Sequence, residues 1–173
     1  VSFQSKEYVI QALQNTMQDG EIRPELRRHA SLLLGRLGWR PVDLDRFAEI
    51  PAGEYQAGVR KDAKEIPHMY FIGRYSVTNI QFARFVKEDG YQTQAYWSDE
   101  GWEWRTGKYD LHALEAVASD WLEHRPLPKR NIPYYWHSIE LSNPIVPVVG
   151  VNWFEAEAYC NWLSKKIVAV PEG

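Results

Sequence analysis

The chain has 173 residues, of which 45% are hydrophobic and 25% are charged, and its formal net charge is -3. The length is sufficient for one domain with a sizeable core, and both fractions are ordinary for a globular protein. The small negative charge excludes the strongly basic surface that attracts nucleic acid or an anionic membrane, and no apolar run approaches the length of a membrane span. We therefore expect neither nucleic acid nor a membrane as a partner.

The cysteine content indicates the compartment. Cys160 is the single cysteine, which excludes an internal disulfide and is typical of a reducing environment. No apolar segment of the signal-peptide type opens the chain. We therefore expect a cytoplasmic protein.

Residues 1–40 are expected to form a helical hairpin. Asp19-Gly20 ends the first helix, Pro24 opens the second and Gly38 ends it. Apolar residues fall on one face of each helix: Val9, Ala12, Leu13 and Met17, then Leu26, Ala30, Leu33, Leu34 and Leu37. The pair is similar to the last repeat of a HEAT-type helical array. A helical collar packed on the edge of the following domain is an equally supported alternative.

Residues 41–46 are expected to be a linker, and residues 47–173 the main domain. Two short strands, at 47–51 and 54–58, are predicted to be joined by a turn at Ala52-Gly53, and a third strand at 68–72 follows a polar loop at 61–65. Thr78 is a strong N-cap with Gln81 three residues later, so a helix is predicted there, with Asp89-Gly90 ending it. Its buried face is predicted to consist of Ile80, Phe82, Phe85 and Val86.

The segment from Tyr96 to Trp104 is strongly aromatic, in a chain that has eight tryptophans. The favoured interpretation is that these rings fill the core of a fold poor in regular secondary structure. The alternative is a site that stacks a flat ligand or a sugar. Its candidate residues are Trp97, Asp99, Trp102, Trp104 and Arg105.

Residues 107–125 resemble an insertion with one helix, after which prolines hold the chain extended. The apolar face of that helix is predicted to contain Leu111, Leu114, Ala118, Trp121 and Leu122.

The stretch from Pro147 to Lys166 reads PVVGVNWFEAEAYCNWLSKK, and the rest of the domain is expected to be organised around it. Its β-branched start predicts a buried strand at 148–151 that turns directly into a helix. Asn152 and Glu155 form a capping-box-like start, and Trp153 is expected to fix the angle between strand and helix. Cys160 is expected to be a buried, inert thiol on the apolar face that Tyr159 and Trp162 supply.

The sequence contains no catalytic or metal-binding motif of the HExxH, CxxC, phosphate-loop or GxSxG type. The five histidines have no ligand-like spacing. We therefore predict neither catalytic residues nor a metal site within this chain.

The 147–166 stretch, together with Ile50-Pro51-Ala52-Gly53 and Val77-Thr78-Asn79, resembles the formylglycine-generating-enzyme-like (sulfatase-modifying factor) domains over about residues 47–166. The resemblance implies an α+β domain of the irregular C-type-lectin-like type. Its structural motif residues here are Asn79, Asn152, Trp153, Glu155, Tyr159, Cys160 and Trp162. The family's RLPTEAEWE-like segment does not follow, so we expect the incomplete, N-terminal part of the domain.

The favoured function is a non-catalytic scaffold or fragment of this family that binds a ligand or a protein. The alternative is the N-terminal part of an oxidase that converts a sulfatase cysteine to formylglycine, completed by a C-terminal half. The resemblance implies that copper and calcium sites would belong to that half, so no cofactor is expected in this chain. The expected partner is the C-terminal half or a second copy, with residues 167–170 as an added or exchanged strand.

Overall fold

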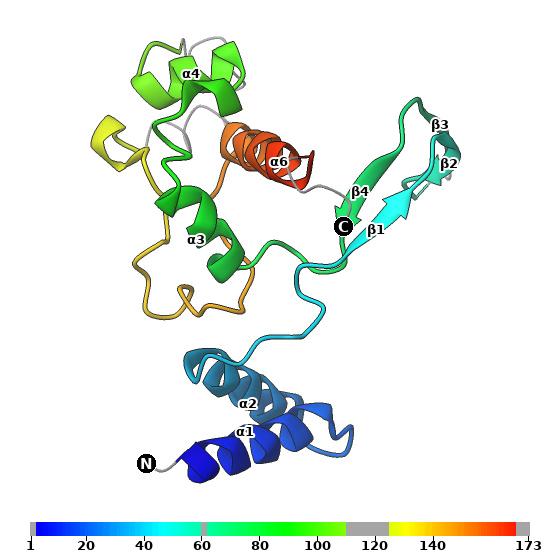
Figure 1. Cartoon of the computed structure of the whole chain (residues 1–173), viewed down its shortest axis with the longest axis vertical. Coiled ribbons are helices and arrows are strands. Elements are labelled where there is room, and N and C mark those ends of the chain that lie inside the picture. Colours follow the sequence, from blue (N-terminus) through cyan, green and yellow to red (C-terminus); the bar gives the residue numbers. More distant parts are fainter. Residues whose placement is uncertain (1–2, 60–61, 110–124, 169–173) are drawn as a thin grey trace.

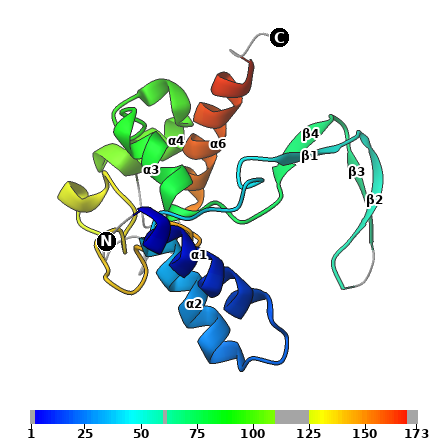
Figure 2. The same ribbon diagram turned by 60° about the horizontal axis from the view of Figure 1, so that its bottom comes forward.

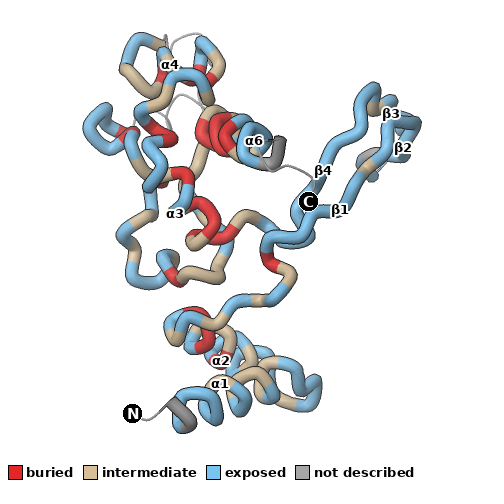
Figure 3. The backbone as a smooth tube through the Cα atoms, viewed as in Figure 1, coloured by how far each residue is buried: buried red, intermediate tan, exposed pale blue. Residues whose placement is uncertain are grey.

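The computed structural model describes residues 3–59, 62–109 and 125–168. It has three parts: a helical hairpin, a body built on α3, α4 and α6, and a long two-stranded arm (Figure 1). Helices and strands are both present, in agreement with the α+β expectation. Buried residues concentrate in the body, whereas the arm is exposed along most of its length (Figure 3).

The hairpin consists of α1 (Phe3–Gln18) and α2 (Pro24–Arg36), in the two stretches for which helices were expected. Asn143 connects α2 to the loop that precedes α6. Its Nδ2 donates a hydrogen bond to the carbonyl of Leu32 over 2.7 Å. At Gly35, a Cβ atom would lie only 2.2 Å from Asn143 Oδ1, so the close approach requires glycine. Membership of a HEAT-type array stays a prediction.

The arm contains four strands: β1 (Phe47–Ile50), β2 (Gly53–Ala57), β3 (Asp62–Ile66) and β4 (Tyr70–Gly73). β1 pairs antiparallel with β4 near the body, and β2 pairs antiparallel with β3 toward the tip. Figure 2 shows the arm extending away from the helices.

The sequence prediction for this region was therefore partly wrong. The expected polar loop at 61–65 is mostly strand β3, and β2 pairs with β3 across the tip rather than with β1. β3 has the sequence DAKEI and is exposed at four of its five positions, so it has no apolar pattern by which it could be found. Its backbone pairing with β2, and not burial of its side chains, makes it a strand.

The core of the body is aromatic. It joins α3 (Asn79–Lys87), α4 (Asp99–Thr106) and α6 (Trp153–Val168), with η1 (Gln94–Tyr96) and η3 (Leu127–Lys129) as short connecting turns. The Phe82 ring stacks on Tyr159 at a centroid distance of 5.1 Å, and Phe85 meets Trp162 edge-on at 5.9 Å. The buried members are Phe82, Phe85, Tyr91, Trp97, Trp104, Ala158, Tyr159 and Trp162.

The capping box of Thr78 and Gln81 is present at the start of α3, and the helix ends before Asp89-Gly90, so this prediction is confirmed. The expected strand at 148–151 is not formed. Gly150 has a φ of 74°, and a Cβ there would lie 2.9 Å from Tyr134 Cβ, so the chain bends against that segment instead of extending. Within the described residues, this stretch forms an isolated bridge between Thr78 and Pro147 and a hydrogen bond from Val148 N to the carbonyl of Val77.

Two further predictions concern the ends of the described segments. Ile167 and Val168 continue α6, so an added strand starting at 167 is wrong for these two residues, and residues 169 and 170 lie outside the described part. The helix predicted around Leu111 to Leu122 also lies outside the described residues.

The contact between α2 and Asn143 leads to a prediction. Gly35→Ala should lower the free energy of unfolding by about 1 to 3 kcal/mol, because the added methyl overpacks the junction. Gly20→Ala is the matched control, since nothing lies within 4 Å of a Cβ at that position. Urea unfolding followed by circular dichroism compares the two variants. Equal stabilities would show that the junction relaxes freely and that α2 is not fixed there.

Candidate functional site

A buried ion pair lies where α6 begins. Glu155 is three residues after the N-cap Asn152, so the capping geometry turns its carboxylate back toward the start of the helix. Asn152 N donates to Glu155 Oε2 over 2.9 Å, and Glu155 N donates to Asn152 Oδ1 over 2.9 Å. The side chain of Glu155 has no exposed surface.

Arg125 neutralises this carboxylate. Its guanidinium forms a two-pronged contact with Glu155, with Nη2 donating to Oε1 over 2.7 Å and Nη1 donating to Oε2. Arg125 also donates to the carbonyl of Ile132, so one side chain connects α6 to the 125–132 segment. Tyr91 Oη donates to Glu155 Oε1 over 2.5 Å. Burial, the negative charge of Glu155 and this hydrogen bond raise the pKa of Tyr91 well above its ordinary value.

Two guanidinium groups contact the ring of Trp104. Arg125 and Arg130 lie over its ring at 5.3 and 5.2 Å from the centroid. Arg130 Nη1 donates to the carbonyl of Trp104 over 2.5 Å. Burial, followed by the positive charges of Arg125 and Arg105, lowers the pKa of Arg130. Glu155, Arg125, Tyr91 and Arg130 thus form a buried polar centre. We infer that this polar centre holds the segments of the body together.

The second candidate site is a groove of about 370 Å³ between the base of the arm and α6. None of its lining residues carries a charge, and they are Phe47, Met69, Tyr70, Phe71, Cys160, Leu163 and Ser164. The groove is therefore suited to apolar side chains rather than to an ionic ligand.

Cys160 faces this groove and is exposed, so the expectation of a buried thiol was wrong. Cys160 follows Tyr159 on α6, and one residue rotates the side chain by about 100° around a helix, away from the core face. Partial desolvation of the sulfur, followed by the charge of Glu157, raises the pKa of the thiol.

Trp153 is also placed differently from the expectation. Its side chain is 77% exposed, so it does not fix an angle between a strand and α6. Phe154, the next residue, faces inward instead and packs against Trp104 and Tyr109 at 6.2 and 5.5 Å. The motif residues Asn79, Tyr159 and Trp162 contact other parts of the protein interior. Asn79 Nδ2 donates to the carbonyls of Leu141 and Asn143, while Tyr159 and Trp162 lie in the core.

The five candidate ligand residues do not share one open surface. Trp97 and Trp104 are buried in the core, and Trp102 packs against that core while partly exposed. Arg105 Nε donates to the carbonyl of Tyr91 over 3.1 Å, and Asp99 is exposed in the first turn of α4. These positions favour the interpretation that the rings fill the core, and a ligand-binding role stays a prediction.

Sequence reasoning missed Arg125 and the groove. Arg125 stands alone before a proline-rich stretch, so it has no local pattern that marks a buried ion pair. The apolar residues at 69–72 were recognised as a strand, but only the structure shows that they stay about half exposed among the described residues. The signal in the sequence was that these apolar residues are consecutive and do not alternate with polar ones.

Within residues 3–59, 62–109 and 125–168, no group of three or more histidine, cysteine, aspartate or glutamate side chains is placed to hold a metal ion. Among the described helices, none combines the length and apolar composition needed to cross a membrane.

The sequence was compared with known proteins. The profile of the sulfatase-modifying factor enzyme 1-like domain matches residues 36–172. The formylglycine-generating enzyme of Bos taurus is 31% identical over 146 residues, which is 75% of this chain and 38% of that protein.

Two other relatives have different names. The hercynine oxygenase of Mycolicibacterium thermoresistibile is 33% identical over 96 residues, which is 56% of this chain and 19% of that protein. The inactive C-alpha-formylglycine-generating enzyme 2 of Bos taurus is 26% identical over 144 residues, which is 70% of this chain and 44% of that protein. The chain thus spans less than half of each of these three relatives.

The buried ion pair generates a stability prediction. Arg125→Met should lower the free energy of unfolding by about 3 to 5 kcal/mol, because it leaves the Glu155 carboxylate buried without its cation. Arg74→Met is the matched control, since Arg74 pairs with Asp43 on the surface and should cost at most about 1 kcal/mol. Chemical denaturation measures both. Similar small losses would mean that the pair does not order the body.

Two tryptophans on α6 test the revised account of that helix. Trp162→Ala should cost about 3 to 5 kcal/mol because Trp162 lies in the aromatic core. Trp153→Ala should change stability by no more than about 0.5 kcal/mol, as for other exposed positions. Thermal unfolding followed by circular dichroism decides between them. A larger loss for Trp153→Ala would restore its expected role at the start of α6.

Proposed function

Because the chain belongs to the family of sulfatase-modifying factor enzyme 1-like domains, we propose that it is a non-catalytic scaffold of this family that binds another polypeptide. The binding surface is the apolar base of the arm with the adjoining groove along α6. The proposal includes that the described residues are the N-terminal part of an irregular C-type-lectin-like domain. Its partner is the C-terminal half of such a domain or a second copy of the chain, in the cytoplasm.

One observation carries this proposal. Met69, Tyr70, Phe71 and Ile72 are consecutive large apolar residues, and they are 50, 41, 49 and 50% exposed. Successive side chains of a strand point to opposite faces, so Tyr70 and Ile72 lie exposed on one face of the β1–β4 pair and Phe71 lies exposed on the other, beside Glu49. A contiguous exposed apolar surface of this kind marks an interaction site in a soluble protein.

The buried centre supports a scaffold role for the body. Glu155 and Tyr91 have the chemistry of an acid or a base, but both are buried and engaged with each other and with Arg125. In the described part of the chain, neither side chain is open to solvent. Their function in the scaffold is to fix α6, and with it the wall of the groove that contains Leu163.

The alternative is that the chain is the N-terminal part of a formylglycine-generating oxidase. The observation that favours it is the 31% identity to the formylglycine-generating enzyme of Bos taurus, of which only 38% is covered. Copper and calcium sites would then belong to the uncovered part. The relatives include an oxygenase, a formylglycine-generating enzyme and a protein named as inactive, so membership of the family alone does not select the chemistry.

A direct assay separates the two functions. The purified chain is incubated in air with copper, a thiol reductant and a sulfatase-derived cysteine peptide, and the peptide mass is measured. A chimera is assayed in parallel, in which residues 1–166 are followed by the sequence that follows the matched region in the bovine enzyme. The bovine enzyme is the positive control. We expect no formylglycine from the chain or the chimera. Conversion by either would contradict the scaffold proposal and support the oxidase.

A further inference from the structure

We propose that a groove between the helical hairpin and the body binds an extended, uncharged, proline-rich segment of another polypeptide. This hairpin groove has a volume of about 720 Å³ and, among the described residues, shares no lining residue with the groove at the base of the arm. Its wall on the hairpin side belongs to α1, which precedes the residues 36–172 that match the family profile. This second binding site is independent of the surface at the arm that carries the proposed scaffold function.

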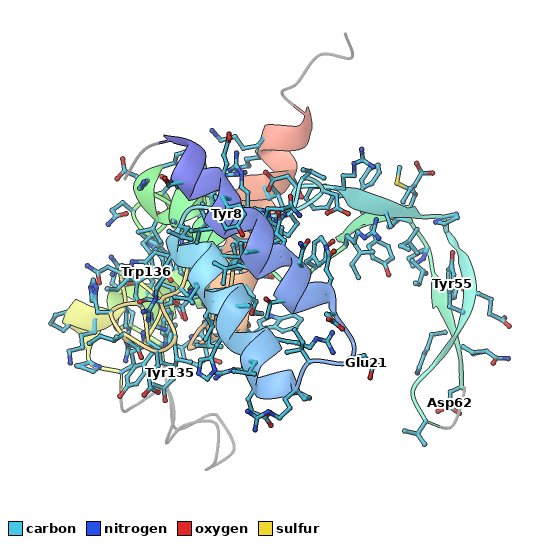
Figure 4. All side chains as sticks on the ribbon, turned by 90° about the horizontal axis from the view of Figure 1, so that it is seen from below. Tyr8, Glu21, Tyr55, Asp62, Tyr135 and Trp136 are labelled. Atoms are coloured by element: carbon cyan, nitrogen blue, oxygen red, sulfur yellow. The ribbon has the colours of Figure 1, made fainter. Side chains whose placement is uncertain are left out.

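Four stretches of the chain surround the hairpin groove: the end of α1, the segment after α2, the segment before α3 and the segment before α6. In Figure 4, Tyr8 lies near the start of α1 and Glu21 lies just after its end. The groove runs along the half of the helix toward Glu21, which contains Gln14, Met17 and Gln18. A hollow of this volume at the junction of two structural units has the size and position of a typical binding site.

Hydrogen bonds hold the walls of the hairpin groove in place. Arg27 Nε of α2 donates to the carbonyl of Met17 over 3.0 Å, which fixes the end of α1. The contact between Asn143 and α2 described above fixes the hairpin to the body. On the facing wall, Tyr75 Oη donates to Asp43 Oδ1 over 3.0 Å. A groove whose walls are already ordered binds a partner with less loss of conformational entropy.

The lining of the hairpin groove favours an occupant without charge. Among the described residues that line it, Asp43 alone carries a charge. This carboxylate is already paired, because Arg74 Nη1 lies 3.1 Å from Asp43 Oδ2 and Tyr75 donates to Oδ1. A charged ligand would therefore lose hydration in the groove without gaining an unpaired ionic partner.

Aromatic rings and prolines supply the apolar surface of the hairpin groove. Trp39 and Tyr75 both line it, and Tyr75 is 42% exposed. Pro41 and Pro147 lie in the same lining. Grooves lined by aromatic rings are the usual receptors for proline-rich segments in the polyproline II conformation, because this preformed helix loses little entropy when it binds.

Unused hydrogen-bond donors distinguish an extended proline-rich segment from a helical one. In the described part of the chain, the amides of Gln14 and Gln18 and the indole N–H of Trp39 form no side-chain hydrogen bond. A polyproline II segment has no internal hydrogen bonds and its prolines have no N–H, so its backbone offers acceptors that need donors. An α-helical segment satisfies its carbonyls internally and would leave the donors of the groove unpaired.

A binding assay with the full chain tests the chemistry of the occupant. The probe is a decaproline peptide with an N-terminal fluorophore, and a glycine-serine peptide of the same length with the same fluorophore is the control. We expect fluorescence anisotropy to show decaproline binding at least about tenfold tighter than the control peptide. Its Kd should change less than about twofold between about 50 and about 500 mM salt, because the contacts are uncharged. Equal binding of the two peptides, or a strong loss of affinity with salt, would overturn the proposal.

The two methionines of the chain locate the bound peptide, because Met17 lines the hairpin groove and Met69 lines the groove at the arm. A decaproline with a benzophenone group is irradiated with the chain, since photoexcited benzophenone reacts preferentially with methionine. Mass spectrometry should find the crosslink at Met17. A crosslink at Met69 would place the peptide at the arm and overturn this site while leaving the scaffold proposal intact. Formylglycine production would contradict the scaffold proposal without changing the Met17 result.

Matched substitutions test individual contacts. Tyr75→Ala should weaken decaproline binding about tenfold or more, whereas Tyr8→Ala, at a position 78% exposed outside the groove, should leave it unchanged. Gln14→Ala should weaken binding about threefold, whereas Gln11→Ala on the same helix should not. Circular dichroism verifies that the variants remain folded. If Tyr75→Ala unfolds, Ser76→Lys replaces it, because Ser76 is an exposed lining residue and the substitution places a charge in the groove. Unchanged affinity in a folded Tyr75→Ala or Ser76→Lys variant would contradict the proposal.

A second copy of the chain is the competing occupant of the hairpin groove. Sedimentation velocity is measured with and without decaproline. We expect a species of unchanged association state under both conditions. A dimer that decaproline dissociates would identify the second copy as the occupant and overturn the assignment to a proline-rich segment.

Discussion

The burial of the Glu155 carboxylate is the constraint on which the rest of the body depends. An ionised carboxylate without solvent is costly unless a cation and hydrogen-bond donors surround it. Arg125, Tyr91 and the backbone of Asn152 supply them from three separate stretches of the chain. The start of α6, the loop before α4 and the 125–132 segment must therefore lie together, and the aromatic core forms around them.

The core and the polar centre support each other. Trp104 is both a core residue and the surface on which Arg125 and Arg130 lie, so its ring links the apolar and the charged parts of the interior. Large rings suit a body in which long loops connect the helices, because each ring fills space between segments that have no regular packing. One face of α6 is fixed by this interior, and the neighbouring face borders the groove.

The arm differs from the body because most of its side chains are exposed. Its tip, where β2 pairs with β3, is polar and held by backbone pairing, whereas its base exposes large apolar side chains on both faces. The described part of the body thus buries a core of large aromatic side chains, whereas the base of the arm exposes such side chains. This difference is why we assign binding to the arm and a supporting role to the polar centre.

The sequence by itself determined the features that depend on neighbouring residues. The capping box at Thr78, the limits of α3 and the capping of α6 by Asn152 and Glu155 are local patterns, and all are present in the structure. The family was also identifiable from the ordered motif around α6. Only the tertiary structure decided which side of a helix or strand packs against another segment. It exposed Trp153 and Cys160, bent the chain at Gly150 and joined Arg125 to Glu155 across 30 positions, because burial and ion pairing between distant segments depend on how the whole chain packs.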